Sequence, residues 1–307
     1  ADITVDEIIP EIRKFFPGIN KDSINFFYHG TYNVFDINNK YILRVADRAF
    51  RNSIGLDMLK KESEVIDFLR DKLPLPIPKL LHINESSLIP FSIHEKIPGK
   101  SLVFVIDDFT IDQKVKIGTK VGKFLSVLHS KELVDKYMNY FPKEKQSDDD
   151  FNHFYRAKWT SRFQEAKDIA YQYLNQQQQK WLTKIFEEFL ENDNNFTFSP
   201  RITHCDFDTS NILVDPNNHQ VTGIIDFENC KIWDPAADLL FYNEGPEFMK
   251  AVLDNYLFSD DNSLPSRMKF NYSRTCCAYL IWGSKHNRSG MIEEGKKIIK
   301  NNMKTFP

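Results

Sequence analysis

The chain has 307 residues, 41% of them hydrophobic, and a formal net charge of −3 at pH 7. A chain of this length exceeds the usual size of one hydrophobic core, so we expect two lobes or domains. The composition lacks the basic excess of a nucleic-acid-binding protein, and no stretch reaches the length of an apolar helix that spans a membrane.

Four cysteines are present, at Cys205, Cys230, Cys276 and Cys277. Their spacing does not match that of metal ligands, which favours a reduced protein of the cytoplasm. The first residues lack a basic region followed by an apolar one, so we expect no signal peptide.

The N-terminal segment predicts a helix from Thr4 to Phe16. Thr4 and Glu7 have the spacing of a capping box, and apolar residues recur behind them at helical positions. Short runs of β-forming residues then predict three strands, at 24–28, 33–37 and 41–45.

A second helix is expected from Leu56 to Arg70, where apolar residues fall on one face. It ends before the proline-rich stretch 73–78, because proline lacks an N–H donor and restricts the residue that precedes it. Residues 88–97 are a further strand candidate. We place the boundary between two lobes, 1–98 and 99–307, near the Pro98-Gly99 step.

The remaining sequence is mainly helical in pattern. Thr110 and Gln113 have the spacing of another capping box, and apolar residues continue at helical positions as far as Leu128. The charged stretch 143–150 is predicted to be a loop. Further helices are expected around 159–174, 178–190, 279–283 and 290–303.

Two neighbouring segments, 202–215 and 223–229, contain the strongest pattern in the chain. His204-x-Asp206 is followed by Asn211, and a turn then leads to a strand that ends at Asp226. This order matches the kinase spacing H-x-D-x-x-x-x-N followed by an acid where a kinase carries D-F-G.

The spacing has a chemical reason. Phosphoryl transfer needs a carboxylate that faces the acceptor hydroxyl, and it needs oxygen ligands for the magnesium that bridges the phosphates. Asp206 would supply the first, and Asn211 and Asp226 would supply the second. The alternative interpretation is an ordinary hairpin with polar loop residues.

These motifs, together with Asp234-Pro235-x-x-Asp238-Leu239, resemble the aminoglycoside phosphotransferase family. That kinase-like group also includes choline, homoserine and methylthioribose kinases. The resemblance, from about Tyr28 to Leu240, implies an α+β fold with a small β-rich N-terminal lobe and a larger, mainly helical C-terminal lobe. It also implies a monomer that phosphorylates a small-molecule hydroxyl with ATP or GTP and Mg2+, without a membrane or nucleic-acid partner.

The resemblance further implies how the nucleotide phosphates are held. Arg44 lies where a kinase strand offers its phosphate-binding Lys, and Glu62 would orient it. Arg can hold phosphate oxygens through its planar fork, although its geometry differs from that of Lys. The alternatives are an exposed strand Arg and a solvated helix Glu.

Other nucleotide contacts are implied on both sides of this strand. Gly30 and Thr31 lie where a loop should cover the phosphates, although only one glycine is present there. The linker between the lobes would read the base through its backbone, at His94, Lys96 and Ile97. Backbone recognition leaves no side-chain pattern, so ATP and GTP both remain open.

The acceptor is suggested by charge. Residues 201–260 contain eleven acidic and three basic residues, a balance of −8. Such a surplus near Asp206 would attract a cationic acceptor such as an aminoglycoside, through Asp208, Glu244 and Glu247. A solvated acidic face explains the same count. A metabolite kinase for choline, homoserine or a sugar, and a nucleotide-binding protein without catalysis, are the alternatives.

Overall fold

In the computed structural model, residues 2–48, 51, 53–85, 89–256 and 261–307 are described. They form two compact units, one of Ala1–Phe109 with Thr209–Cys230 and one of Thr110–Asp208 with Lys231–Pro307. The chain therefore leaves the first unit and later returns to it. The lobe boundary near Pro98-Gly99 stays a prediction.

The first unit contains a five-stranded antiparallel sheet in the order β1-β2-β3-β5-β4. The three strands predicted near the N-terminus are confirmed. The strand predicted within 88–97 is confirmed as well, although Leu88, the first residue of that stretch, lies outside the described residues. The strand after the proline-rich stretch was missed. The bounds are β1 Ile24–His29, β2 Tyr32–Ile37, β3 Tyr41–Ala46, β4 Leu80–Asn84 and β5 Phe91–Glu95.

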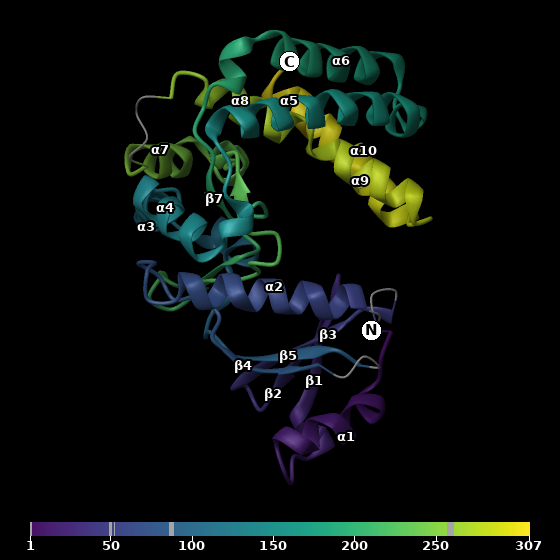
Figure 1. The fold of residues 1–307 in the computed structure, drawn as a ribbon, viewed down its shortest axis with the longest axis vertical. Coiled ribbons are helices and arrows are strands. Elements are labelled where there is room, and N and C mark those ends of the chain that lie inside the picture. Colours follow the sequence, from purple (N-terminus) through teal and green to yellow (C-terminus); the bar gives the residue numbers. More distant parts are fainter. Residues whose placement is uncertain (1, 49–50, 52, 86–88, 257–260) are drawn as a thin grey trace. The chain divides into compact units, whose positions relative to one another are not determined.

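Two helices cover opposite faces of this sheet (Figure 1). α1 (Val5–Phe15) begins with the predicted capping box and packs its isoleucines against one face. α2 (Ser53–Leu69) packs Leu59 against Tyr32 and Ala46 on the other face. Successive residues of a strand point to opposite faces, so alternate residues of β2 and β3 pack against α1 and α2.

A three-stranded sheet in the order β6-β8-β9 completes the first unit. Its strands are β6 Lys100–Ser101, β8 Ile212–Asp215 and β9 Gln220–Ile224. The predicted turn after Asp215 is confirmed, and the Asp215 carboxylate accepts the Asn217 N–H at 2.8 Å. Gly99 leads into β6 with φ +127°, and a Cβ there would lie 2.8 Å from the Val214 carbonyl oxygen. Only glycine fits that approach without strain.

The second unit is mainly helical, with one antiparallel pair of short strands, β7 (Arg201–Thr203) and β10 (Lys231–Trp233). Figure 1 shows α5 beside α6 and α9 beside α10. No helix among the described residues is long and apolar enough to cross a membrane. The helices are α3 Ile111–Leu128, α4 Lys131–Tyr140, α5 Asp148–Glu165, α6 Gln176–Glu191, α7 Pro246–Asp254, α8 Leu264–Ser273, α9 Thr275–Lys285 and α10 Ser289–Thr305.

Two predictions for this unit need correction. The charged stretch 143–150 is not wholly a loop, because α5 begins at Asp148 with Ser147 as its N-cap. Acidic residues in a first helical turn interact favourably with the helix dipole, so these charges favour a helix start. The helix expected at 159–174 ends earlier as an α-helix and continues as a π-helical turn at Ala166–Ala170.

Aromatic side chains form the core of the second unit. Tyr155 of α5 is fully buried, and its ring centroid lies 5.2 Å from that of Trp233 and 5.3 Å from that of Phe198. Burying large aromatic rings in this way provides much of the hydrophobic stabilisation of a core. This core anchors β10, the strand that follows the motif segments.

Two glycines bring α3 against α7. A Cβ on Gly118 would lie 2.9 Å from the Phe248 carbonyl oxygen, and a Cβ on Gly122 would overlap the carbonyl oxygen of Val252. Because backbone atoms occupy the space, no side-chain rotation could relieve the contact. The absence of side chains at these positions sets the separation of the two helices.

We therefore expect Gly122→Ala to destabilise the protein, although alanine favours a helix over glycine by about 1 kcal/mol. Overpacking should outweigh that gain and lower the free energy of unfolding by about 1–3 kcal/mol. Thermal unfolding of the variant measures the effect. The control is Gly290→Ala in α10, where a Cβ would meet no atom within 4 Å. Equal unfolding temperatures for the two variants would contradict the close packing.

Candidate active site

Arg44 is the centre of a charged cluster in the first unit. β3 places its side chain against α2, where it donates to the Glu62 carboxylate. The same guanidinium donates to Asp226 at 3.0 Å and to Glu228 at 3.3 Å. The structure thus brings together three residues that sequence alone singled out, and it adds Glu228.

The carboxylates of this cluster keep Arg44 protonated and give the cluster a negative net charge. The Glu62 side chain is 1% exposed and that of Arg44 is 12% exposed. Burial acts against the charged guanidinium, but Glu62 and Asp226 hold the pKa of Arg44 above its ordinary value. One guanidinium faces three carboxylates, which leaves a formal net charge of −2.

Asp226 follows β9 and adopts φ +69°, a conformation that side chains other than those of Asn and Asp rarely accept. The Ile225 N–H donates to the Asn211 carbonyl oxygen at 3.0 Å, so the hairpin brings Asn211 next to the Asp226 segment. Carboxylate and amide oxygens suit magnesium, and the surplus negative charge nearby favours a divalent cation. These residues therefore fit the predicted magnesium site.

Gly30 and Thr31 form the turn between β1 and β2. The Gly30 N–H donates to the Tyr32 carbonyl oxygen at 3.0 Å, and the Thr31 hydroxyl donates to Glu228 at 3.4 Å. The predicted phosphate-covering turn therefore contacts the same carboxylate that Arg44 contacts. Glu228 was missed by sequence reasoning, although its position two residues after Asp226 was a usable signal.

The three predicted linker residues differ in what they offer. The His94 side chain is buried and bonds to Ser92 at 2.9 Å, and burial followed by the charge of Arg44 lowers its pKa to about 3. Lys96 pairs with Asp36. Within the described chain, no residue bonds to the backbone N–H or C=O of Ile97. Of the three, Ile97 has the backbone best suited to a base.

The second unit holds the predicted catalytic loop. Asp206 is exposed and follows Cys205, which has φ +67°. The fully buried Asp238 holds the loop in place. Its carboxylate accepts the backbone N–H of His204 at 2.7 Å and that of Cys205 at 2.9 Å. Two charge-assisted bonds to consecutive N–H groups can hold a strained loop in one conformation.

A buried chain of hydrogen bonds orients Asp238. His129, the C-cap of α3, places Nε2 3.0 Å from Asp238 and Nδ1 2.8 Å from the Tyr256 hydroxyl. Burial and the charge of Asp238 raise the pKa of Tyr256, so its hydroxyl remains a donor. With its proton on Nε2, the imidazole accepts from Tyr256 and donates to Asp238.

Asp234, the other acid of the D-P-x-x-D motif, has a structural role. It caps the Ala236 N–H at 2.9 Å and accepts from the Tyr155 hydroxyl at 2.7 Å. It also receives Arg267 at 3.0 Å and Asn271 at 3.1 Å. Four donors satisfy this buried carboxylate, so it braces the turn after β10.

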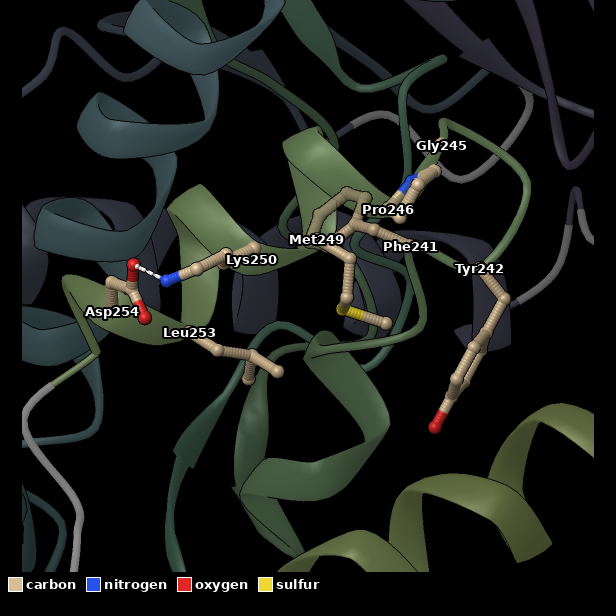
Figure 2. A pocket seen from close by; sticks show the side chains of 8 residues that line it. All are labelled: Phe241, Tyr242, Gly245, Pro246, Met249, Lys250, Leu253 and Asp254. Atoms are coloured by element: carbon tan, nitrogen blue, oxygen red, sulfur yellow. Dashed lines mark hydrogen bonds and ion pairs between the residues drawn. The ribbon is translucent and has the colours of Figure 1, made fainter.

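The three residues predicted to contact the acceptor, Asp208, Glu244 and Glu247, are not equally exposed. Asp208 is exposed, Glu244 is partly buried, and Glu247 is exposed in the first turn of α7. A cavity of about 480 Å³ lies along α7, and neither glutamate lines it (Figure 2). Its wall is apolar apart from the paired Lys250 and Asp254. The acceptor roles stay predictions.

Comparisons with known proteins agree with this geometry. A sequence model described as "Phosphotransferase enzyme family" matches residues 23–269. A comparison with curated proteins gives no match. Among solved structures, the GDP complex of aminoglycoside 2'-phosphotransferase-IIIa is 20% identical, with a TM-score of 0.83 and 98% of each chain covered.

Two further structures are similar to this chain. The streptomycin–ATP–APH(2")-IIa ternary complex is 22% identical over 99% of each chain, with a TM-score of 0.69. APH(4)-Ia is 14% identical over 99% of this chain and 100% of its own, with a TM-score of 0.65. These similarities confirm the predicted α+β kinase-like fold. Because the family match covers most of its length, the chain belongs to the phosphotransferase enzyme family.

Proposed function

We propose that this chain transfers the terminal phosphoryl group of ATP or GTP to a hydroxyl group of a small molecule. The observation that carries the proposal is the cluster in which Arg44 binds Glu62, Asp226 and Glu228. A buried cation held by one carboxylate and facing others provides positive charge for phosphates and oxygen ligands for a metal. Such positioning and charge stabilisation supply most of the catalysis in phosphoryl transfer.

Each residue has one task in this proposal. Asp206 orients the acceptor hydroxyl and takes its proton, while Asp238 keeps the loop in position through its backbone bonds. Arg44 binds phosphate oxygens, and Glu62 keeps its guanidinium in place. Asn211 and Asp226 would hold magnesium, which when bound neutralises charge on the phosphates.

Two classes of acceptor have support. An aminoglycoside is favoured by the negative balance of residues 201–260, through Asp208, Glu244 and Glu247. One similar structure is a kanamycin complex of APH(2")-IIIa and another contains streptomycin. A metabolite with an anionic group is favoured by three basic side chains of the second unit, Lys158, Lys231 and Arg274.

The catalytic acid is tested by Asp206→Asn. Turnover should fall by about 10²–10⁴-fold, the usual contribution of a positioned general base. Nucleotide affinity should stay unchanged, because the amide keeps the shape of the side chain. Asp208→Asn, two residues further on, is the control and should leave the maximal rate intact. Normal turnover by the Asp206 variant would remove this residue from the mechanism.

The pairing of Arg44 with Glu62 is tested by a double-mutant cycle. Arg44→Ala and Glu62→Ala should each raise the Michaelis constant for nucleotide, because both remove the positioned cation. The two effects should overlap by about 0.5–3 kcal/mol, as for residues in direct contact. Glu64→Ala, an exposed position on the same helix, provides the control cycle. Additivity in the Arg44–Glu62 cycle would show that the two act separately.

The acceptor is tested by a coupled nucleotide-turnover assay across aminoglycosides, choline, homoserine and sugars. If an aminoglycoside is the acceptor, its Michaelis constant should rise with salt, because exposed charge pairs are screened over about 8 Å at physiological ionic strength. Neutralising Asp208, Glu244 or Glu247 should raise that constant and leave the nucleotide constant unchanged. Salt-independent turnover, insensitive to all three changes, would contradict these contacts.

A further inference from the structure

Three basic side chains lie together in the second unit, and none of them has an acidic partner in the part of the chain that the structure describes. Lys158 of α5 and Lys231 of β10 place their ammonium nitrogens 4.3 Å and 4.9 Å from the ring centroid of Trp233. Arg274, between α8 and α9, stacks over Trp159 at 4.1 Å and donates to the Asn271 side chain at 2.9 Å. Among the described residues, no carboxylate forms an ion pair with any of the three.

Some lysines on helices of this unit pair with a neighbouring acid, as in Lys131–Asp135, Lys136–Glu132, Lys250–Asp254 and Lys285–Glu165. Lys158 and Lys231 instead both contact the ring of Trp233. The three residues are also only partly exposed, so water cannot fully replace the missing carboxylate. Their charge is therefore concentrated and weakly compensated.

The cluster lies beside the catalytic loop of the same unit. In the β7–β10 pair, Lys231 is opposite Thr203, the residue immediately before His204. Cys205 packs against the aromatic core that includes Trp233, and Lys231 and Arg274 oppose the rise that burial causes in its pKa. The cations therefore lie on the elements that support the loop carrying Asp206.

The neighbouring buried acids are already bonded to other donors. Asp234 already accepts four donors, which include the guanidinium of Arg267. Asp238 accepts two backbone N–H groups and His129. Burial, then repulsion from Lys231, Arg162 and Arg274, lowers the pKa of Lys158 to about 8. An anion among these cations would relieve that repulsion.

The site is also rigid. Trp233 is 7% exposed and packs between aromatic rings of α5, so the surface that both lysines contact cannot move freely. Each cation–π contact stabilises the lysine position by about 0.5–2 kcal/mol. Preorganised cations bind an oxyanion with less loss of side-chain entropy than mobile surface lysines do.

We propose that Lys158, Lys231 and Arg274 form a binding site for an oxyanion, a phosphate or carboxylate group carried by the acceptor molecule. The inference rests on the proposed phosphotransfer and favours an anionic metabolite over an aminoglycoside, whose ammonium groups these cations would repel. It assigns acceptor selectivity to three residues that the family motifs do not include.

The site itself is tested with inorganic phosphate. Calorimetric titration at constant ionic strength should show binding to the wild type, and Lys158→Met or Lys231→Met should weaken it about tenfold, as expected for loss of one charge-assisted bond. Lys167→Met is the matched control, because Lys167 stacks on Phe163 at 4.3 Å outside the cluster. Circular dichroism checks that each variant folds. No phosphate binding by the wild type, or equal binding by all variants, would overturn the site.

The source of the anion is tested by kinetics with homoserine, which carries a carboxylate, and with choline, which does not. Turnover of a carboxylate- or phosphate-bearing acceptor, with a Michaelis constant that rises in Lys158→Met but not in Lys167→Met, supports the proposal. Phosphate binding combined with turnover of aminoglycosides alone would overturn the acceptor assignment and leave the phosphotransfer intact. Phosphate binding without turnover of any acceptor would count against the proposed function instead.

Discussion

The buried carboxylate of Asp238 is the contact on which the proposed catalytic loop depends. It joins two consecutive backbone N–H groups of the loop to His129 and, through it, to Tyr256. Cys205 keeps its positive φ because these bonds offset the strain. A carboxylate this deeply buried requires all of its donors, since an unsatisfied charge in the interior is costly. The loop, the C-cap of α3 at His129 and the segment after α7 that carries Tyr256 therefore form one polar unit, and the position of Asp206 follows from it.

The first unit uses the opposite arrangement, in which one cation is shared among acids. A lysine at position 44 would present a single point charge, whereas the planar fork of Arg44 reaches Glu62, Asp226 and Glu228 together. The substitution of Arg for the kinase Lys is thus accompanied by an extra carboxylate, Glu228. The positive charge stays fixed, and the surplus of acid that suits a metal is kept.

Patterns that depend on neighbouring residues were predictable from the sequence. Both capping boxes, the first three strands and the hairpin that ends at Asp226 follow from local spacing, and all of them are present. The start of α5 was missed because its acidic first turn looked like a solvated loop. The basic cluster was missed for another reason: Lys158, Lys231 and Arg274 come from three separate elements, and only tertiary packing on Trp233 and Trp159 brings them together.

The same limitation applies to charge counted along a stretch of sequence. Residues 201–260 have a balance of −8, yet several of these acids are paired or hydrogen-bonded within the fold. Asp234 and Asp238 are buried among donors, and Asp254 pairs with Lys250. Asp226 and Glu228 share Arg44 with Glu62, so their charge is only partly compensated. An acceptor responds to charges that lack such partners, because paired charges contribute little field beyond a few ångströms. On that criterion, the basic cluster on β10 and α5 determines the charge beside the catalytic loop more than the acidic count does.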